Sequence, residues 1–175
     1  KEYGVLQPII VRKVDNHYEL VSGERRFRAS TLAGHTTIPA LVRQLSDKEV
    51  AEMALIENLQ REDLSYFEEA EGYAKLMSEF NITQEEVAKK MGKSQPTIAN
   101  KLRLLNISPQ VRKEISTNVI TERHVRSLLK LKDEYLQLEV LEKIYKNNLN
   151  VRQTDDLIEN IIITQEKNQK EQNKK

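Results

Sequence analysis

Residues 84–103 read QEEVAKKMGKSQPTIANKLR, and this stretch decides the fold of the central part of the chain. Ala88, a small residue in the middle of the first helix, lets two helices cross closely, and Gly92 tolerates the positive φ of a sharp turn. Apolar residues recur on the inner sides of both helices: Val87, Met91, Ile98 and Leu102. The pattern predicts a helix-turn-helix, whose second helix enters the major groove of DNA. An ordinary pair of packed helices is the alternative interpretation.

The outer face of the second helix carries the side chains that we expect to contact DNA. Because Ile98 and Leu102 face inward, helical spacing exposes the opposite face. Four polar side chains are expected to reach base edges there: Gln95, Thr97, Asn100 and Lys101. Glutamine and asparagine pair with adenine, and lysine pairs with guanine. Lys93 and Arg103 are expected at phosphates, and a solvated helix face is the alternative for each of these residues.

The distribution of charge agrees with a polyanionic partner. The 175-residue chain has a net charge of +1, but residues 81–132 hold eleven basic and four acidic side chains, a net charge of +7. The chain has no cysteine, which excludes disulfides and cysteine-ligated zinc, and its three histidines lack the spacing of metal ligands. No apolar run approaches the roughly 20 residues of a membrane span. A cytoplasmic protein is expected.

A second motif lies near the N-terminus, where residues 22–28 read SGERRFR. Three arginines in four positions repel one another unless a polyanion lies among them. The glycine lets the backbone approach such a ligand, and helical N–H groups and arginines bind phosphate. The stretch therefore predicts a phosphate-binding loop, and an arginine-rich, solvated first turn is the alternative.

A third motif, residues 57–64, reads ENLQREDL and carries more charge than a helix end requires. Glu57 and Asn58 are candidates to bind Mg²⁺ or to orient a water. Arg61 is a candidate to bind phosphate or to pair with Glu57. Magnesium and arginine together are what a triphosphate requires.

The whole pattern predicts an α+β chain, with a small α/β part followed only by helices. Short stretches rich in β-branched residues predict strands at 5–12, 18–21 and 38–43. Pro8 either confines the first strand to a sheet edge or marks its start. We expect one domain at 1–64, a helical domain at 65–162, and a polar tail at 163–175 that is disordered or a fraying helix end.

Repeated capping signals set the expected helix starts. The first helix, at 24–33, is expected to end at Gly34. Later helices are expected to begin after the following residues: Ser46, Ser65, Thr83, Ser94, Ser108 and Thr121. The helix after Thr121 is expected to reach Leu131, and the last two helices are expected at 134–147 and 151–162.

Three motifs in this order, residues 4–12, 23–29 and 57–64, resemble those of the ParB family of chromosome-partitioning proteins. With the helix-turn-helix, the likeness covers residues 4–132. It implies an N-terminal CTP-binding domain with a sulfiredoxin-like fold, followed by a DNA-binding domain. It also implies a homodimeric clamp that loads at a short palindrome in double-stranded DNA. Binding of CTP closes the N-terminal domains, and slow hydrolysis yields CDP and phosphate.

The resemblance assigns roles to individual residues by their position in the motifs. It implies that CTP is bound by Gln7, Ser22, Gly23, Glu24, Arg25, Arg26, Arg28 and Arg61. It places Glu57 and Asn58 at the Mg²⁺ ion and in hydrolysis. The cofactors implied are therefore CTP and Mg²⁺.

The helix-turn-helix favours the nucleoid-occlusion branch of this family, which inhibits division over the nucleoid, over the partitioning branch. Partitioning members usually have arginine at the position of Gln95, a smaller residue at Lys101 and glycine at Arg123. Arg123 therefore joins the predicted DNA-binding residues. Members of this branch also have an N-terminal amphipathic membrane-binding helix and a C-terminal dimerisation domain. Neither is recognised in this sequence, which is expected to be part of a longer, nucleoid-associated protein.

Two other functions stay open at this point. The first is a repressor that uses the helix-turn-helix without any nucleotide. The second is an enzyme, because the expected N-terminal fold resembles that of sulfiredoxin and of certain small-molecule kinases. The absence of cysteine counts against sulfiredoxin chemistry, and a metabolite kinase has no use for the basic helix-turn-helix.

Overall fold

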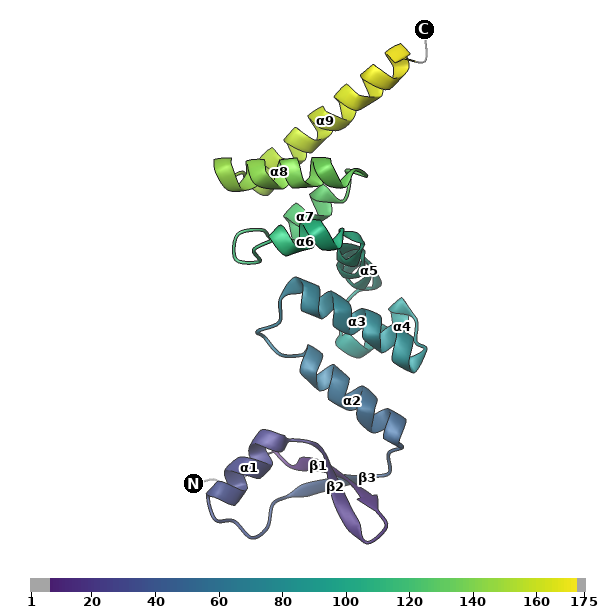
Figure 1. The fold of residues 1–175 in the computed structure, drawn as a ribbon. Helices are drawn as coiled ribbons and strands as arrows, with labels where there is room; N and C mark the ends of the chain where they lie inside the picture. Colours follow the sequence, from purple (N-terminus) through teal and green to yellow (C-terminus); the bar gives the residue numbers. More distant parts are fainter. Residues whose placement is uncertain (1–6, 173–175) are drawn as a thin grey trace. The chain divides into compact units, whose positions relative to one another are not determined.

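The computed structural model describes residues 7–172 of the chain, and the surroundings of the side chains for residues 7–167. It divides into two compact units, and Figure 1 labels the helices and strands along the chain. The first contains the chain up to Asp63 and also Leu76–Thr83, which the predicted domain 65–162 had included. The second contains Leu64–Lys75 and the chain from Gln84 onward. The predicted class, a small α/β part followed by helices, is confirmed.

A three-stranded sheet with the order β2-β1-β3 forms the base of the first unit. Its strands are β1 (Ile9–Val14), β2 (His17–Ser22) and β3 (Ala40–Arg43). β1 is antiparallel to β2 and parallel to β3. It begins directly after Pro8 and lies in the centre of the sheet, so Pro8 marks the start of a strand and not an edge. Residues 5 and 6 of the predicted strand lie outside the described residues.

Two helices complete this part, α1 (Glu24–Leu32) and α2 (Asp47–Leu59). Gly34 ends the α1 segment with a φ of +80°, as expected. The predicted capping box opens α2, because the Ser46 hydroxyl accepts from the Glu49 N–H at 3.3 Å and Glu49 accepts from the Ser46 N–H at 2.8 Å. Arg12 ties β1 to this helix through a 2.6 Å ion pair with Asp47.

The helical part follows the predicted starts closely. Its elements are α3 (Tyr66–Phe80), α4 (Gln84–Met91), α5 (Gln95–Arg103), the 3₁₀ turn η1 (Leu104–Asn106), α6 (Pro109–Glu114), α7 (Glu122–Leu128), α8 (Glu134–Asn147) and α9 (Val151–Gln172). The core of the second unit gathers apolar side chains from α3, α6, α7, α8 and α9, with Val125, Leu128 and Ile158 fully buried. α7 ends at Leu128, three residues before the expected Leu131.

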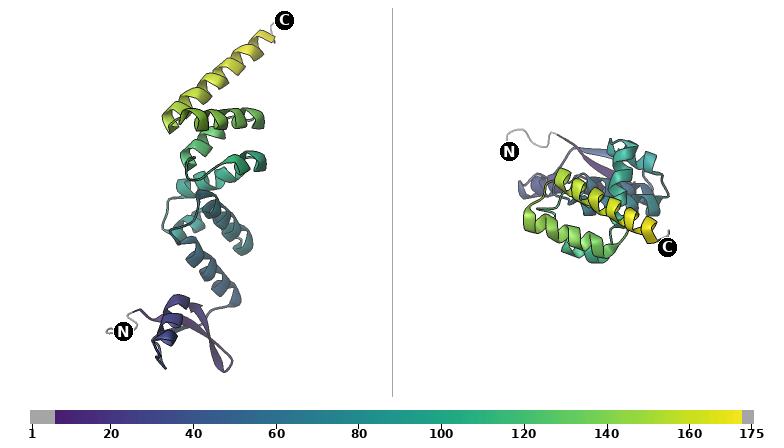
Figure 2. Two further views of the ribbon diagram at one scale, coloured as in Figure 1. Left: turned by 60° about the vertical axis from the view of Figure 1, so that its left-hand side comes forward. Right: turned by 90° about the horizontal axis from the view of Figure 1, so that it is seen from above.

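The last helix is longer than the sequence suggested. The predicted polar tail begins at residue 163, but α9 continues to Gln172 (Figure 2). The extension is rich in glutamine, glutamate and lysine, which lose little side-chain entropy in a helix. Residues 173–175 of the predicted tail lie outside the described residues. In the part of the chain that the structure describes, no helix is both long and apolar enough to cross a membrane.

Candidate functional site

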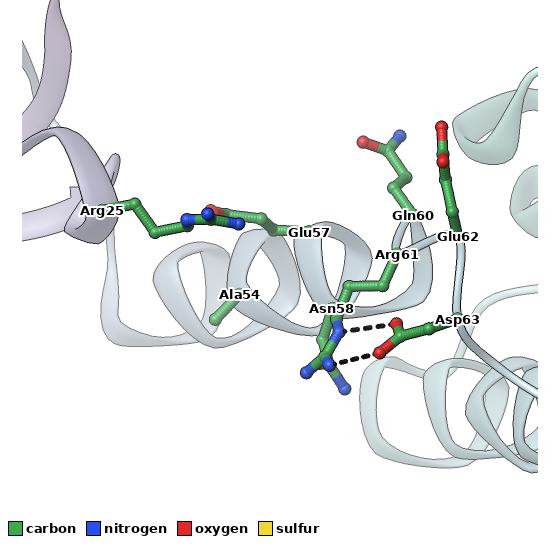
Figure 3. A pocket seen from close by; sticks show the side chains of 8 residues that line it. All are labelled: Arg25, Ala54, Glu57, Asn58, Gln60, Arg61, Glu62 and Asp63. Atoms are coloured by element: carbon green, nitrogen blue, oxygen red, sulfur yellow. Dashed lines mark hydrogen bonds and ion pairs between the residues drawn. The ribbon is translucent and has the colours of Figure 1, made fainter.

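A pocket of about 820 Å³ lies in the first unit, between the start of α1 and the end of α2. Figure 3 shows the side chains around it, with Arg25 and Glu57 extending toward each other. Its lining consists of Arg25, Ala54, Glu57, Asn58, Gln60, Arg61, Glu62 and Asp63. The pocket thus brings cationic, anionic and amide groups together, as a polar, charged ligand would require.

One wall of the pocket is a bidentate ion pair. Arg61 Nε lies 3.1 Å from Asp63 Oδ1, and Arg61 Nη2 lies 2.8 Å from Asp63 Oδ2. The hydrogen bonds from Arg61 lower the pKa of Asp63 below its usual value. Asp63 therefore stays ionised and holds the planar guanidinium in one orientation. Pairing with Glu57 was one of the two alternatives for Arg61, and the structure pairs Arg61 with Asp63, two positions away.

The turn before α1 requires glycine at position 23. Gly23 has a φ of +104°, and a Cβ there would lie 2.8 Å from Ile9 Cγ2. Phe27 N–H donates to the Gly23 carbonyl at 3.0 Å and closes the first turn of α1. The sequence therefore bends sharply from β2 into a helix whose first residues include Arg25, and this bend brings Arg25 to the pocket.

The structure gathers only part of the predicted nucleotide site in this pocket. Arg25, Glu57, Asn58 and Arg61 line it, whereas the other candidates are not among its lining residues. Those are Gln7, Ser22, Gly23, Glu24, Arg26 and Arg28. Arg26 Nη1 instead donates to the carbonyls of Gln7 and Pro8, at 3.0 and 2.6 Å, and Arg28 forms a 2.6 Å ion pair with Glu24. Arg26 thus ties α1 to the entry of β1.

Four lining residues were not among the predicted site residues: Ala54, Gln60, Glu62 and Asp63. The last three belong to the charged motif at 57–64, so the motif itself contained the signal. Ala54 carries no polar group, but it lies three and four positions before Glu57 and Asn58. Helical spacing on α2 places all three on one face.

The donor set for Mg²⁺ is incomplete without a ligand. Among the described residues, no group of three or more histidine or acidic side chains has the geometry of a metal site. Mg²⁺ commonly takes one or two carboxylates, several waters and the phosphate oxygens of a substrate. Glu57 and Asn58 fit that arrangement, because phosphate oxygens would supply the missing ligands.

The helix-turn-helix of the second unit has the expected interior. Val87 and Ile98 are fully buried and Ala88 is 3% exposed, so α4 and α5 approach closely. Gly92 has a φ of +63°, and Lys93 N–H donates to the Ala88 carbonyl at 2.9 Å. Ser94 caps α5 by accepting from the Thr97 N–H at 3.3 Å.

The outer face of α5 presents most of the predicted DNA-binding side chains. Gln95, Thr97 and Arg103 are exposed, and Asn100 is half-buried. Arg123, in the first turn of α7, is also exposed. Gln95 Nε2 donates to Gln84 Oε1 of α4 at 3.1 Å, which orients an amide at the start of α5.

Lys101 departs from the expected exposure. It is only 9% exposed, and its Nζ lies 2.7 Å from Glu69 Oε2 and 2.8 Å from Glu122 Oε2. The spacing explains the error, because Lys101 follows Ile98 by three positions and so lies toward the inner side of α5. Two carboxylates from other helices make this burial tolerable for an ammonium group.

Lys93 is also more constrained than a phosphate-contacting lysine on an open surface. Its side chain is 39% exposed and forms an ion pair with Glu69. It donates to the Tyr73 hydroxyl at 3.0 Å and lies over the Tyr73 ring, 5.7 Å from the centroid.

Comparisons with known proteins find relatives for both parts of the chain. Residues 1–59 match the family model of the ParB N-terminal domain, and residues 62–162 match that of the ParB HTH domain. The chain is 48% identical to nucleoid occlusion proteins of Halalkalibacterium halodurans, over 162 residues, and Bacillus thuringiensis strain Al Hakam, over 163 residues. These alignments cover 93% of this chain but 57% and 56% of those proteins, so the chain spans little more than half their length.

A solved structure is similar over most of the chain. It is the C-terminally truncated chromosome-partitioning protein ParB from Caulobacter crescentus, complexed to the centromeric parS site. Its sequence is 39% identical, the TM-score is 0.79, and the match covers 89% of this chain and 83% of that one. The DNA-binding domain of a ParB complexed to parS matches 63% of this chain with 35% identity and a TM-score of 0.55.

Proposed function

The chain belongs to the ParB family, and on that premise we propose that it is part of a CTP-dependent DNA clamp of the nucleoid-occlusion type. The observation that carries the proposal is the presence of two different sites in one chain. A pocket lined by two arginines and three carboxylates lies in the first unit, and a basic helix-turn-helix lies in the second. A simple repressor requires only the second of these sites.

In this proposal the pocket binds the triphosphate of CTP. Arg25 and Arg61 approach from α1 and from the end of α2, and both present guanidinium groups suited to phosphate oxygens. Glu57 and Asn58 hold Mg²⁺, which neutralises phosphate charge, or they orient the water that attacks the γ-phosphate. Gln7, Ser22, Gly23, Glu24, Arg26 and Arg28 shape or complete this site from the first two motifs.

The DNA-binding part of the proposal places α5 in the major groove of a short palindrome. Gln95, Thr97 and Asn100 face base edges, and Arg103 and Lys93 lie toward phosphates. Arg123 contributes from the start of α7. In this proposal Lys101 does not contact DNA. Its ammonium group pairs with two carboxylates and so fixes α5 to the neighbouring helices.

The clamp would work as a homodimer whose N-terminal domains engage when CTP binds. The longer protein would be associated with the nucleoid and would contact the membrane through a segment before the first motif. Its role would be to inhibit division over the nucleoid. The 48% identity to nucleoid occlusion proteins supports this branch.

Titration calorimetry with the four ribonucleoside triphosphates and Mg²⁺ tests the nucleotide site. We expect CTP to bind more tightly than ATP, GTP or UTP, and Arg25→Ala to weaken binding of CTP at least tenfold. Arg43→Ala is the matched control, because Arg43 is exposed on β3 and does not line the pocket. Equal affinity for all four nucleotides, or an equal loss in both variants, would contradict a dedicated CTP pocket.

A chromosome-partitioning ParB is the second candidate, favoured by the structural likeness to the parS-bound protein. Binding to duplexes with parS and with the site of the nucleoid occlusion relatives, in parallel and at one salt concentration, separates the two. Preference for parS would move the assignment to partitioning. A nucleotide-independent repressor predicts that CTP leaves cross-linking between protomers unchanged, and a kinase predicts phosphorylation of a metabolite.

A further inference from the structure

A cluster of charged side chains joins α3, α5 and α7 inside the second unit. Its centre is Glu69 on α3, whose side chain is 16% exposed. Glu69 Oε2 lies 2.7 Å from Lys101 Nζ, and its Oε1 accepts from Lys93 and from the Tyr73 hydroxyl. Glu122 Oε2 of α7 lies 2.8 Å from the same ammonium group of Lys101. One carboxylate thus contacts two lysines of the helix-turn-helix.

The two lysines lie at opposite ends of α5. Lys93 immediately precedes Ser94, which caps the helix, and Lys101 lies in its last turn. A carboxylate that holds both ends restrains the helix against tilting and against rotation about its axis. The restraint at Lys101 is stronger than that of a surface ion pair, because its side chain is only 11% exposed and breaking a buried pair leaves a charge without its partner.

The hydrogen bonds that Glu69 accepts favour its ionised form in the folded protein. Burial would raise its pKa, but hydrogen bonds from Lys101, Lys93 and Tyr73 outweigh it and lower the pKa to about 2. The pKa of Tyr73 is raised to about 12, chiefly by burial and by its hydrogen bond to Glu69. At neutral pH Glu69 is therefore an anion that contacts a helix which is itself proposed to meet an anion.

We propose that Glu69 is a positioning residue for DNA recognition, which fixes the orientation of α5 by holding Lys93 and Lys101. The inference rests on the proposed DNA-binding function. Base contacts depend on the placement of side chains within a fraction of an ångström, whereas contacts to phosphates tolerate displacement. Loss of Glu69 therefore weakens binding to the specific site more than binding to other DNA.

The direction in which Glu69→Gln changes DNA affinity distinguishes a positioning role from a purely electrostatic one. Glu69→Gln removes a negative charge near the DNA-facing surface. Electrostatics alone would then strengthen binding to every duplex, since affinity for the phosphate backbone rises with positive charge. Positioning instead requires that affinity for the specific palindrome falls while affinity for a scrambled duplex is unchanged or rises.

The test uses the 175-residue chain, the palindrome that it selects from a randomised pool, and a scrambled duplex of equal length. Fluorescence anisotropy at one salt concentration gives the two dissociation constants and their ratio. For Glu69→Gln we expect the preference for the palindrome to fall about tenfold or more, equivalent to about 1.4 kcal/mol. A preserved preference, or a parallel gain on both duplexes, would overturn the inference.

Glu71→Gln is the matched control. Glu71 lies on the same helix and its loss changes the net charge equally, but it pairs with Arg112, at 2.7 Å, and its side chain is 51% exposed. We expect this variant to keep the preference of the wild type. An equal loss in Glu71→Gln would show that any charge change on α3 has the same effect, which contradicts a specific role for Glu69.

If Glu69→Gln is unfolded, as judged by loss of its helical circular dichroism signal, Glu69→Asp serves as the second variant. It retains the charge but withdraws the carboxylate by one methylene, so that it cannot hold both lysines at their present distances. We expect a reduced preference in a folded protein, and an unchanged preference overturns the inference. If the wild type itself shows no preference between the duplexes, the proposed function fails, which is a different outcome from failure of the Glu69 role.

Discussion

Glu69 is a charged side chain that is largely buried, with 16% of its surface exposed. Its folded pKa of about 2 lies below the usual value of a glutamate, about 4.3. Glu69 therefore stabilises the fold fully above the unfolded pKa, and this stability is lost as the pH falls through the folded pKa. The affected window runs from about pH 5 down to about pH 2.

The prediction concerns acid unfolding of the second unit. Between pH 5 and pH 2 we expect the wild type to lose about 1–2 kcal/mol of unfolding free energy that Glu69→Gln does not lose, allowing for partial solvent screening. Urea unfolding at several pH values, followed by circular dichroism, measures the difference. Glu71→Gln is expected to follow the wild type, and parallel curves for wild type and Glu69→Gln would contradict the paired carboxylate.

Position 23 requires glycine because a side chain there would clash with Ile9. Gly23→Ala combines a φ of +104° with a Cβ 2.8 Å from Ile9 Cγ2, so we expect it to destabilise the first unit by about 2–3 kcal/mol. Gly34→Ala separates the two causes, because Gly34 also has a positive φ, +80°, but nothing lies within 4 Å of its added Cβ. Thermal unfolding of both variants measures the costs, and equal losses would show that the contact with Ile9 is unimportant.

At the scale of elements, α5 depends on its first turn. The Ser94 hydroxyl accepts from the Thr97 N–H at 3.3 Å and lies 2.8 Å from the Thr97 hydroxyl. We expect Ser94→Ala to cost about 1 kcal/mol, the usual value of a lost N-cap. Ser116→Ala is the control, since Ser116 uses its backbone N–H, not its hydroxyl, to bond Tyr145. Chemical denaturation measures the unfolding free energy of both variants, and equal values would contradict a stabilising cap at Ser94.

The elements that sequence predicted well are those decided by neighbouring residues. The starts of α2, α3 and α6 follow from caps in which Ser46, Ser65 and Ser108 meet N–H groups three positions away. Such caps act within one turn, so the local sequence contains both partners. The glycine at 92 and the apolar positions of the helix-turn-helix are equally local.

The features that sequence missed depend on partners far away in the chain. The carboxylates that bury Lys101 come from α3 and α7, and no spacing within α5 reveals them. The tie between Arg26 and the carbonyls of Gln7 and Pro8 likewise depends on the packing of α1 beside the sheet. The pocket was predicted in part. The motif at 57–64 supplies one of its walls, whereas the position of Arg25 depends on the bend at Gly23.

At the scale of the whole molecule, the two proposed ligands bind to different compact units of the chain. The pocket lies entirely within the first unit, and the helix-turn-helix and the Glu69 cluster lie within the second. A ligand stabilises the part of a protein that binds it, by about 2.7 kcal/mol at a concentration of 100 times its dissociation constant. CTP and DNA are therefore expected to protect different parts of the chain.

Hydrogen exchange followed by mass spectrometry tests this expectation. With CTP and Mg²⁺ we expect slower exchange in α1, at the end of α2 and in the 60–63 segment, because those backbones form the pocket. With the selected palindrome we expect slower exchange in α4 and α5. ATP at the same concentration is the control for the first effect, and a scrambled duplex is the control for the second. Protection of the pocket by ATP as strong as that by CTP would contradict nucleotide selectivity, and protection of α5 by both duplexes alike would contradict sequence-specific reading by this helix.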